Sequence, residues 1–126
     1  MKRTIIRDCL RLAREKNAAH PEKFKHYTFI VQDNKVLEWG VNRFGDPLLS
    51  HGYPEYGKIH SENDAYRKAK GLLKDTVWEA INIRLSKKRE LRTAIPCACC
   101  SAYFKTLGYS VVWASTADHG FVKVPL

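Results

Sequence analysis

Long apolar runs and acidic side chains are both scarce in this sequence. No stretch approaches the roughly 18 consecutive apolar residues that cross a membrane as a helix. The start Met1-Lys2-Arg3 leads into further charged residues and lacks an apolar signal core. The sequence has no internal repeat, low-complexity tract or interdomain linker. We therefore expect a soluble, cytoplasmic protein with no membrane partner and a single domain over residues 1–126, because a chain of this length buries one hydrophobic core.

Acidic residues number only 13 against 22 basic ones, which gives a net formal charge of +9 at neutral pH. Excess lysine and arginine attract phosphate groups at long range, so nucleic acid is a candidate partner. Part of the charge lies on a predicted first helix, 3–16, where Arg3, Arg7, Arg11 and Arg14 gather opposite the apolar face. Such a face is usually a solvated surface, so the charge indicates a class of partner and no reaction.

Cysteine is sparse and unevenly placed. Besides Cys9, the sequence has Cys97, Cys99 and Cys100 within four residues. This spacing is poor for a disulfide framework and is typical of metal binding or catalysis, which indicates a reducing compartment. We expect Cys9 to lie in the core, and Cys99 to be packed or idle because it cannot share the helix face of Cys97.

The apolar periodicity and the turn residues predict an α/β protein. Helices are expected at 3–16, 60–73 and 97–107, the last ending at Gly108. Strands are expected at 26–31, 36–41, 77–85, 111–115 and 121–124, with the first two in a hairpin, a long loop over 42–59 and a turn at 86–89. Only a few residues around Asp118 join the last two strands, too few for a parallel crossover, so this pair must be antiparallel.

Two short motifs stand at the starts of the second and third predicted helices. The first is His60-Ser61-Glu62, and the second is Pro96-Cys97-Ala98-Cys99-Cys100. Residues three apart share a helix face, so Cys97 and Cys100 can bind one metal ion together with His60. Two thiolates and one imidazole suit zinc, and three protein ligands leave a position open to water, as in catalytic sites.

Glu62 distinguishes a catalytic site from a structural one. It lies two residues past His60, is not needed as a ligand, and is well placed to take a proton from water and deliver it to a leaving nitrogen. The alternative is a structural zinc site completed by Cys9, Cys99 or another histidine, in a binding module without turnover. A pure scaffold has no need of Glu62.

These motifs, His-x-Glu followed by Pro-Cys-x-x-Cys, resemble those of the cytidine deaminase-like superfamily of zinc-dependent nucleobase deaminases, and the resemblance runs from about His26 to the last strand. It implies a three-layer α/β fold with a central mixed sheet of about five strands and helices on both faces. It also implies one zinc ion per chain on His60, Cys97 and Cys100, with Glu62 as the catalytic residue. The implied reaction is hydrolytic removal of an amino group as ammonia.

Substrate-binding residues follow from the same resemblance. Asn42, at the end of the second predicted strand, matches an asparagine that hydrogen-bonds the sugar or base in many of these enzymes. Ser61 takes the variable middle position of the first motif, where a backbone N–H meets the pyrimidine carbonyl. The loop aromatics Phe44, Tyr53 and Tyr56 follow Asn42 and offer faces on which a base stacks.

The size of the substrate stays open. The expected terminal hairpin resembles nucleoside-type cytidine deaminases, yet Phe44 stands where free-nucleoside enzymes have a ribose-binding glutamate, and the pair Asn42-Arg43 resembles the tRNA-acting group. We expect conversion of cytosine to uracil in a (deoxy)cytidine nucleoside or nucleotide, with Arg43, Lys58 or the turn 87–89 holding a phosphate. The alternative is a deaminase acting on cytosine or adenine within single-stranded nucleic acid or tRNA. Relatives commonly form homo-oligomers, which makes one plausible here.

Overall fold

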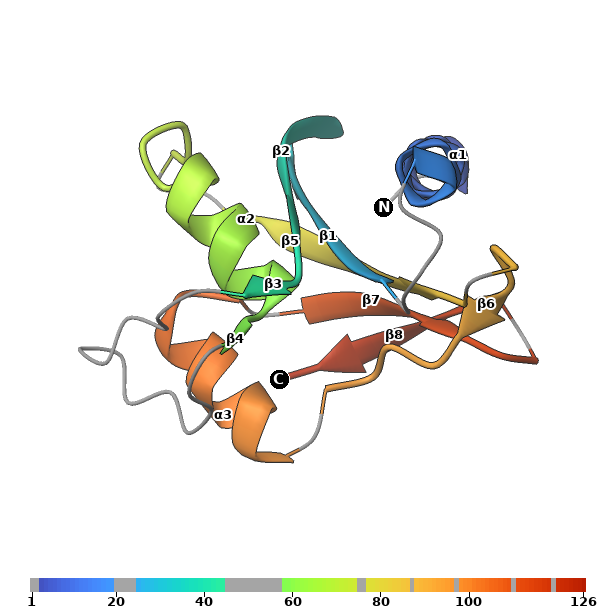
Figure 1. Ribbon diagram of the computed structural model, residues 1–126. Coiled ribbons are helices and arrows are strands. Elements are labelled where there is room, and N and C mark those ends of the chain that lie inside the picture. Colours follow the sequence, from blue (N-terminus) through green and yellow to red (C-terminus); the bar gives the residue numbers. More distant parts are fainter. Residues whose placement is uncertain are drawn as a thin grey trace.

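The computed structural model describes residues 3–19, 25–44, 58–74, 77–86, 88–96, 98–109, 111–118 and 120–126. In these segments the chain forms three helices, a mixed six-stranded sheet and a separate two-stranded ribbon (Figure 1). The predicted α/β class is confirmed. No helix in these segments is both long and apolar enough to cross a membrane.

Helix α1 (Arg3–Ala19) is amphipathic, as expected, and runs three residues beyond the predicted end. Cys9, Ala13 and Asn17 recur every fourth residue and are buried, whereas Arg3, Arg7, Arg11 and Arg14 are exposed. Burial raises the pKa of the Cys9 thiol to about 12. Cys9 is therefore a neutral core residue at neutral pH.

The predicted hairpin is confirmed as β1 (Lys25–Gln32) and β2 (Lys35–Val41), which pair antiparallel. Asp33 and Asn34 form its two-residue turn with φ of 53° and 60°. Such left-handed values at both turn positions match the twist of the strands, and aspartate and asparagine tolerate them well.

The segment expected to be a long loop contains a short ribbon. Strand β3 (Arg43–Phe44) pairs antiparallel with β4 (Lys58–Ile59), so the two ends of the segment lie side by side. Its central part, including Tyr53 and Tyr56, lies outside the described residues.

Helix α2 (Ser61–Ala69) follows β4 and is four residues shorter at its end than expected. Strand β5 (Glu79–Leu85) then leads to β6 (Leu91–Arg92), an element that the sequence did not predict. Helix α3 (Ala98–Thr106) closes at Gly108, whose φ of 97° agrees with the predicted glycine cap.

Strands β7 (Val111–Thr116) and β8 (Gly120–Pro125) end the chain as the expected antiparallel pair. The sheet order is β2-β1-β5-β7-β8, with β6 paired to β5. Only β5 and β7 run parallel within this order, and α3 lies between them in the sequence. Five strands thus form the continuous path, as predicted, and β6 adds a short sixth.

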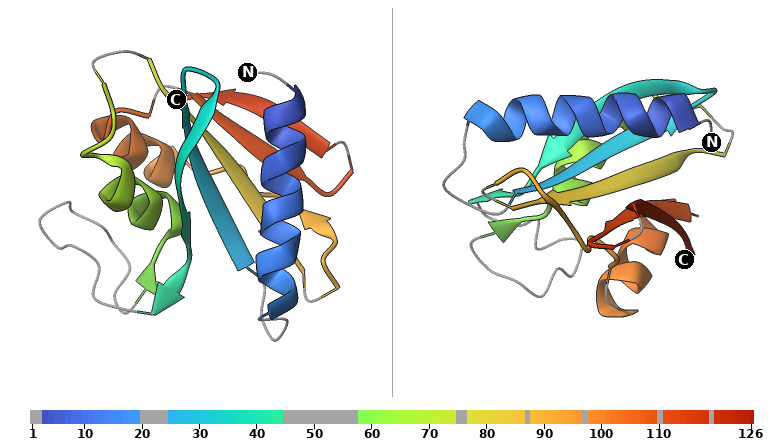
Figure 2. Two further views of the ribbon diagram at one scale, coloured as in Figure 1. Left: turned by 90° about the horizontal axis from the view of Figure 1, so that it is seen from above. Right: turned by 90° about the vertical axis from the view of Figure 1, so that its right-hand side faces the viewer.

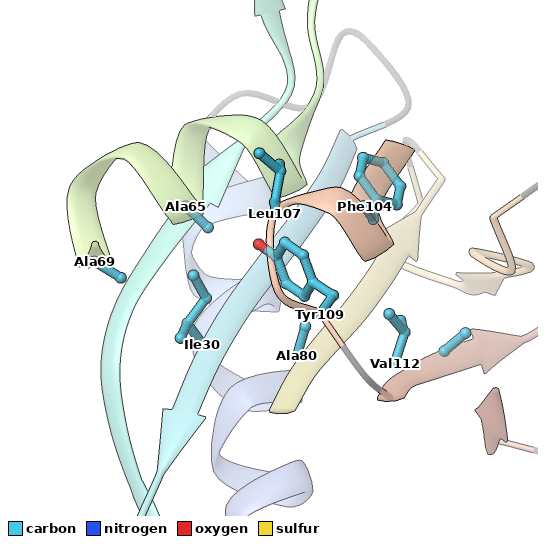
Figure 3. Packing of buried hydrophobic residues seen from close by; sticks show 9 residues of the cluster. Ile30, Ala65, Ala69, Ala80, Phe104, Leu107, Tyr109 and Val112 are labelled. Carbon is cyan, nitrogen blue, oxygen red and sulfur yellow. The ribbon is translucent and has the colours of Figure 1, made fainter. Parts of the chain in front are cut away.

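Each face of the sheet has its own hydrophobic core, because side chains alternate along a strand. Cys9 and Ala13 of α1 pack on Phe29 and Ile81. On the other face, the side chains of α2 and α3 join Ile30, Ala80 and Val112, as Figure 3 shows; the members from the helices and the segment after α3 are Ala65, Ala69, Phe104, Leu107 and Tyr109. Helices therefore cover both faces, in three layers (Figure 2).

Gly40 allows α2 to lie directly on β2. A Cβ atom at this position would meet the backbone nitrogen and Cα of Ala65 and would lie 2.6 Å from the carbonyl oxygen of Ser61. These atoms belong to the helix backbone, so they cannot move aside as a flexible side chain would. The glycine thus sets how closely the start of α2 approaches the sheet.

We predict that Gly40→Ala lowers the free energy of unfolding by about 1–3 kcal/mol or more, because overpacking usually costs this much. Gly71→Ala is the matched control, because a Cβ there would meet nothing within 4 Å. Gly71→Ala should leave the free energy of unfolding unchanged or raise it by up to about 1 kcal/mol, because alanine reduces the conformational freedom of the unfolded chain. Urea unfolding measures both, and equal stabilities of the two variants would contradict the close approach.

Candidate functional site

His60 stands at the junction between β4 and α2. Its backbone is extended, with φ −76° and ψ 152°, and it is the N-cap of the helix. Its carbonyl oxygen accepts the first helical hydrogen bond from Asp64 N at 3.0 Å. Because α2 starts here, the next two residues of the motif fall in the first turn and face the sheet, where Ser61 and Glu62 are both buried.

Glu62 is a buried carboxyl group, with only 7% of the residue exposed. The Asn82 side-chain amide, from the middle of β5, donates to Glu62 Oε1 at 2.8 Å. Burial raises the pKa of Glu62, opposed by the residue's own backbone N–H, the charge of His60 and the Asn82 hydrogen bond. The carboxyl is thus held in one orientation and shielded from bulk water.

The Asn82 side chain belongs to a polar network on the sheet. The Thr28 hydroxyl donates to Asn82 Oδ1 at 2.8 Å, and Thr28 Oγ1 lies 2.7 Å from Ser61 Oγ. Thr28 and Asn82 are direct cross-strand partners on β1 and β5. The Ser61 hydroxyl therefore connects the helix to the sheet, and the predicted role of its backbone N–H toward a pyrimidine stays a prediction.

Two further contacts hold α2 in place. Asp64, 2% exposed, accepts from Val41 N of the edge strand β2 at 3.2 Å, and pairs with Arg67 and Lys68 of its own helix. The hydroxyl of Tyr109 donates to the backbone carbonyl of Glu62 at 2.8 Å. In Figure 3 this tyrosine lies between α2 and α3. The first turn of α2 is thus tied to β2 on one side and to the end of α3 on the other.

Asn42 and His26 are bound to each other where β1 begins and β2 has just ended. Asn42 Oδ1 accepts from His26 N at 2.8 Å, and Asn42 N donates to His26 O at 3.2 Å. Burial, Arg84 and His60 lower the pKa of His26 to about 4. His26 is therefore neutral at pH 7, and alternation along β1 puts its side chain on the same sheet face as Thr28.

The second motif is described only in part. Cys97 lies outside the described residues, and Cys100 lies in the first turn of α3. No cluster of three His, Cys, Asp or Glu side chains suited to a metal ion occurs within the described segments; with Cys97 outside them, this finding does not bear on the proposed ligands. Phe44 lies on β3, and turn residue 87 is also outside the described residues.

Cys9 is separated from the motif residues by the sheet. It packs under α1 with Phe29 and Ile81, on the face opposite Ser61 and Glu62. The six-stranded sheet lies between the Cys9 thiol and the polar network of Ser61 and Glu62. Cys9 is therefore removed from the candidates for a fourth ligand.

Sequence reasoning missed Thr28, Asn82 and His26 as parts of this site. One available signal was Asn82, an amide between two isoleucines in the predicted strand, because such a side chain needs a buried partner. A second was alternation along β1, which puts His26 and Thr28 on one face. Which partner each side chain meets depends on strand register, and the local sequence does not specify that register.

Comparison with known proteins adds no relative: no protein-family model matches this chain, and no curated protein sequence matches it. The interpretation of the site rests on its own residues.

We predict that Asn82→Ala lowers the free energy of unfolding by about 1–3 kcal/mol, because the buried Glu62 carboxyl loses the Asn82 donor and the Thr28 hydroxyl keeps only its contact with Ser61. Thr28→Val should be destabilising too. Since the two residues share one hydrogen bond, the double variant should lose less than the sum of the single losses. Chemical denaturation of all four proteins tests this, and strictly additive losses would argue against the network.

Proposed function

We propose that this protein is a zinc-dependent hydrolytic deaminase that converts cytosine to uracil in a (deoxy)cytidine nucleoside or nucleotide. One observation carries the proposal: the buried carboxyl of Glu62, two residues after His60, is held through Oε1 by Asn82. An ionisable group is costly to bury, and this one stands next to a metal-binding side chain at a helix start. A residue that transfers protons is one for which this cost of burial is expected.

The donor set fits zinc. His60, Cys97 and Cys100 would provide one imidazole and two thiolates, the ligands that zinc prefers. Support for bringing them together comes from α2 and α3, which share one hydrophobic cluster on one sheet face, and from the Tyr109 bond to Glu62. Because Cys9 lies on the other sheet face, a closed structural site would need Cys99 or another histidine as its fourth ligand, whereas the three motif ligands alone would leave a position open to water. When bound, zinc supplies the Lewis acid that makes water nucleophilic at neutral pH.

In this proposal Glu62 moves the protons. With Oε1 engaged by Asn82, Oε2 takes a proton from the attacking water as its oxygen bonds to C4 of cytosine. Glu62 would deliver that proton to ring N3, then take the second proton from the new C4 hydroxyl and deliver it to the exocyclic nitrogen, after which the C4–N bond breaks and ammonia leaves. Water and cytosine are consumed and uracil and ammonia are formed, so the reaction balances without a redox partner.

Asn42 is the proposed orienting residue for the sugar or base. Its carbonyl oxygen is used by His26 N, so the amide Nδ2 is the group that would donate to the substrate. Ser61 would act through its backbone N–H, and Phe44 on β3 would stack on the base. The antiparallel pairing of β7 and β8 supports the nucleoside or nucleotide type of substrate within the resemblance. The charge of +9 favours the alternative, the same chemistry on a single-stranded nucleic acid or tRNA.

We predict that Glu62→Gln lowers turnover by about 10²–10⁴-fold, the usual contribution of a general acid–base residue, while zinc stays near one ion per chain. Mass spectrometry and ammonia release follow the reaction on cytidine, deoxycytidine, their monophosphates, adenosine and short oligonucleotides. Glu90→Gln, at a carboxyl group 57% exposed, is the matched control and should keep full activity. Undiminished turnover in Glu62→Gln would remove Glu62 from the mechanism, and activity on oligonucleotides alone would favour the alternative substrate.

We predict further that Cys100→Ser and Cys97→Ser each reduce bound zinc to well below one ion per chain, because a hydroxyl is a far weaker zinc ligand than a thiolate. The cysteine control is Cys9→Ala, which lies on the other sheet face and should retain its zinc. Elemental analysis of protein purified in the presence of zinc measures this. Full zinc content in both serine variants would refute the ligand set.

A further inference from the structure

A basic depression lies on the face of the molecule that is covered by α1. Three arginines line it: Arg11 and Arg14 from α1, and Arg89 from the turn between β5 and β6. Glu15 and Ala18 complete the lining, and the open volume is about 510 Å³. Figure 2 shows this turn beside the C-terminal half of α1. The depression is therefore separated from the Glu62 network by the sheet.

The backbone of the turn holds Arg89 in a costly conformation. Its φ is 62°, in the left-handed region that disfavours a long side chain. The buried Ser86 stabilises this geometry, because its hydroxyl accepts from Lys88 N and Glu90 N, both at 3.2 Å, and its carbonyl accepts from Arg89 N at 2.9 Å. These hydrogen bonds fix the connection between the antiparallel strands β5 and β6, and so fix the place from which Arg89 presents its cation to the depression.

The charges in the depression are incompletely neutralised. Arg11 shares its guanidinium between Asp8 and Glu15, each at 3.8 Å. Within the described part of the chain, Arg14 and Arg89 form no ion pair with a carboxylate. Exposed pairs at this distance are weak, so Asp8 and Glu15 reduce the positive potential without cancelling it. Two guanidinium groups thus have no carboxylate partner among the described residues, and a guanidinium is well suited to phosphate oxygens.

We propose that this depression binds the phosphodiester backbone of a single-stranded nucleic acid. Beyond the depression, Arg7 and Arg3 continue the row of arginines along α1. Neighbouring arginines four residues apart are separated by about 6 Å along the helix axis. The row is therefore a line of charge and not a pocket for a single phosphate. A single strand can bend into the concave surface between α1 and the turn, whereas a duplex is stiff over this length. The proposal goes beyond the deaminase function and requires neither zinc nor Glu62.

The test uses the full chain and a fluorescein-labelled dT20 oligonucleotide, with binding followed by fluorescence anisotropy in EDTA at several salt concentrations. Arg14→Ala/Arg89→Ala should bind about tenfold more weakly or worse at low salt. Loss of two phosphate contacts should also make the slope of log K against log salt shallower by about 1.4. Because both side chains are exposed, the melting temperature should be unchanged, and it is measured alongside.

A charge-matched control separates a site from a general effect of net charge. Lys35→Ala/Lys70→Ala removes two exposed cations at the β1–β2 turn and the end of α2, and should leave both affinity and slope as in the wild type. Equal losses of affinity in the two double variants would overturn the proposal. Two further results would also overturn it: tighter binding of a duplex of the same length than of dT20, or competition by a polyglutamate peptide of equal charge as effective as that by the oligonucleotide. Because no step requires turnover, an inactive but oligonucleotide-binding protein would fail the proposed function and leave this proposal standing.

Discussion

The hydrogen bond between Asn82 and Glu62 is the constraint on which the rest of the site depends. A carboxyl group that is 7% exposed is tolerable only with a partner, and that partner comes from the middle of β5. Asn82 is held in turn by Thr28, its direct neighbour across the ladder, and Thr28 reaches Ser61. A one-residue slip of β1 against β5 would turn Thr28 to the α1 face, so that Ser61 and Asn82 would both lose the Thr28 hydroxyl. The register of the central strands and the start of α2 are therefore specified together.

The same hydrogen-bond network explains why α2 packs so closely against the sheet. Short hydrogen bonds from its first turn to β1 and β5 require the helix backbone to approach β2, and Gly40 is the residue that allows this. Asp64 then binds the free N–H of Val41 on the edge strand, which also covers an edge that would otherwise pair with another chain. With α2 fixed at both places, His60 lies close enough to the start of β1 for its charge to add to burial and Arg84 in lowering the pKa of His26, which is itself bound to Asn42.

Features encoded locally could be predicted from the sequence, and features that depend on distant partners could not. The α1 periodicity, the Asp33–Asn34 turn and the Gly108 cap are each specified within a few residues, and each is confirmed. The segment after α2 is different: the Gln32 side chain accepts from Lys74 N and donates to Lys74 O, a contact 42 residues away in sequence that fixes the path between α2 and β5. Strand β6 likewise depends on Ser115, whose hydroxyl donates to Arg92 O. The motif spacing singles out His60 and Glu62 as candidate site residues, but the contacts of Asn82 and Thr28 follow only from strand register.

Strand β5 and the turn after it position polar and charged side chains on both faces of the sheet. Alternation along β5 directs Asn82 to the α2 side, while Ile81 and Ile83 pack under α1. The chain then leaves β5 at Leu85, and the turn organised by Ser86 carries Arg89 to the α1 side. Asn82, which binds the buried carboxyl, and Arg89, which lines the basic depression, are thus only seven residues apart in sequence but serve opposite faces of the sheet. Any shift of β5 that disturbed Glu62 would move Arg89 relative to Arg11 and Arg14, so both surfaces depend on the pairing of β5 with β1.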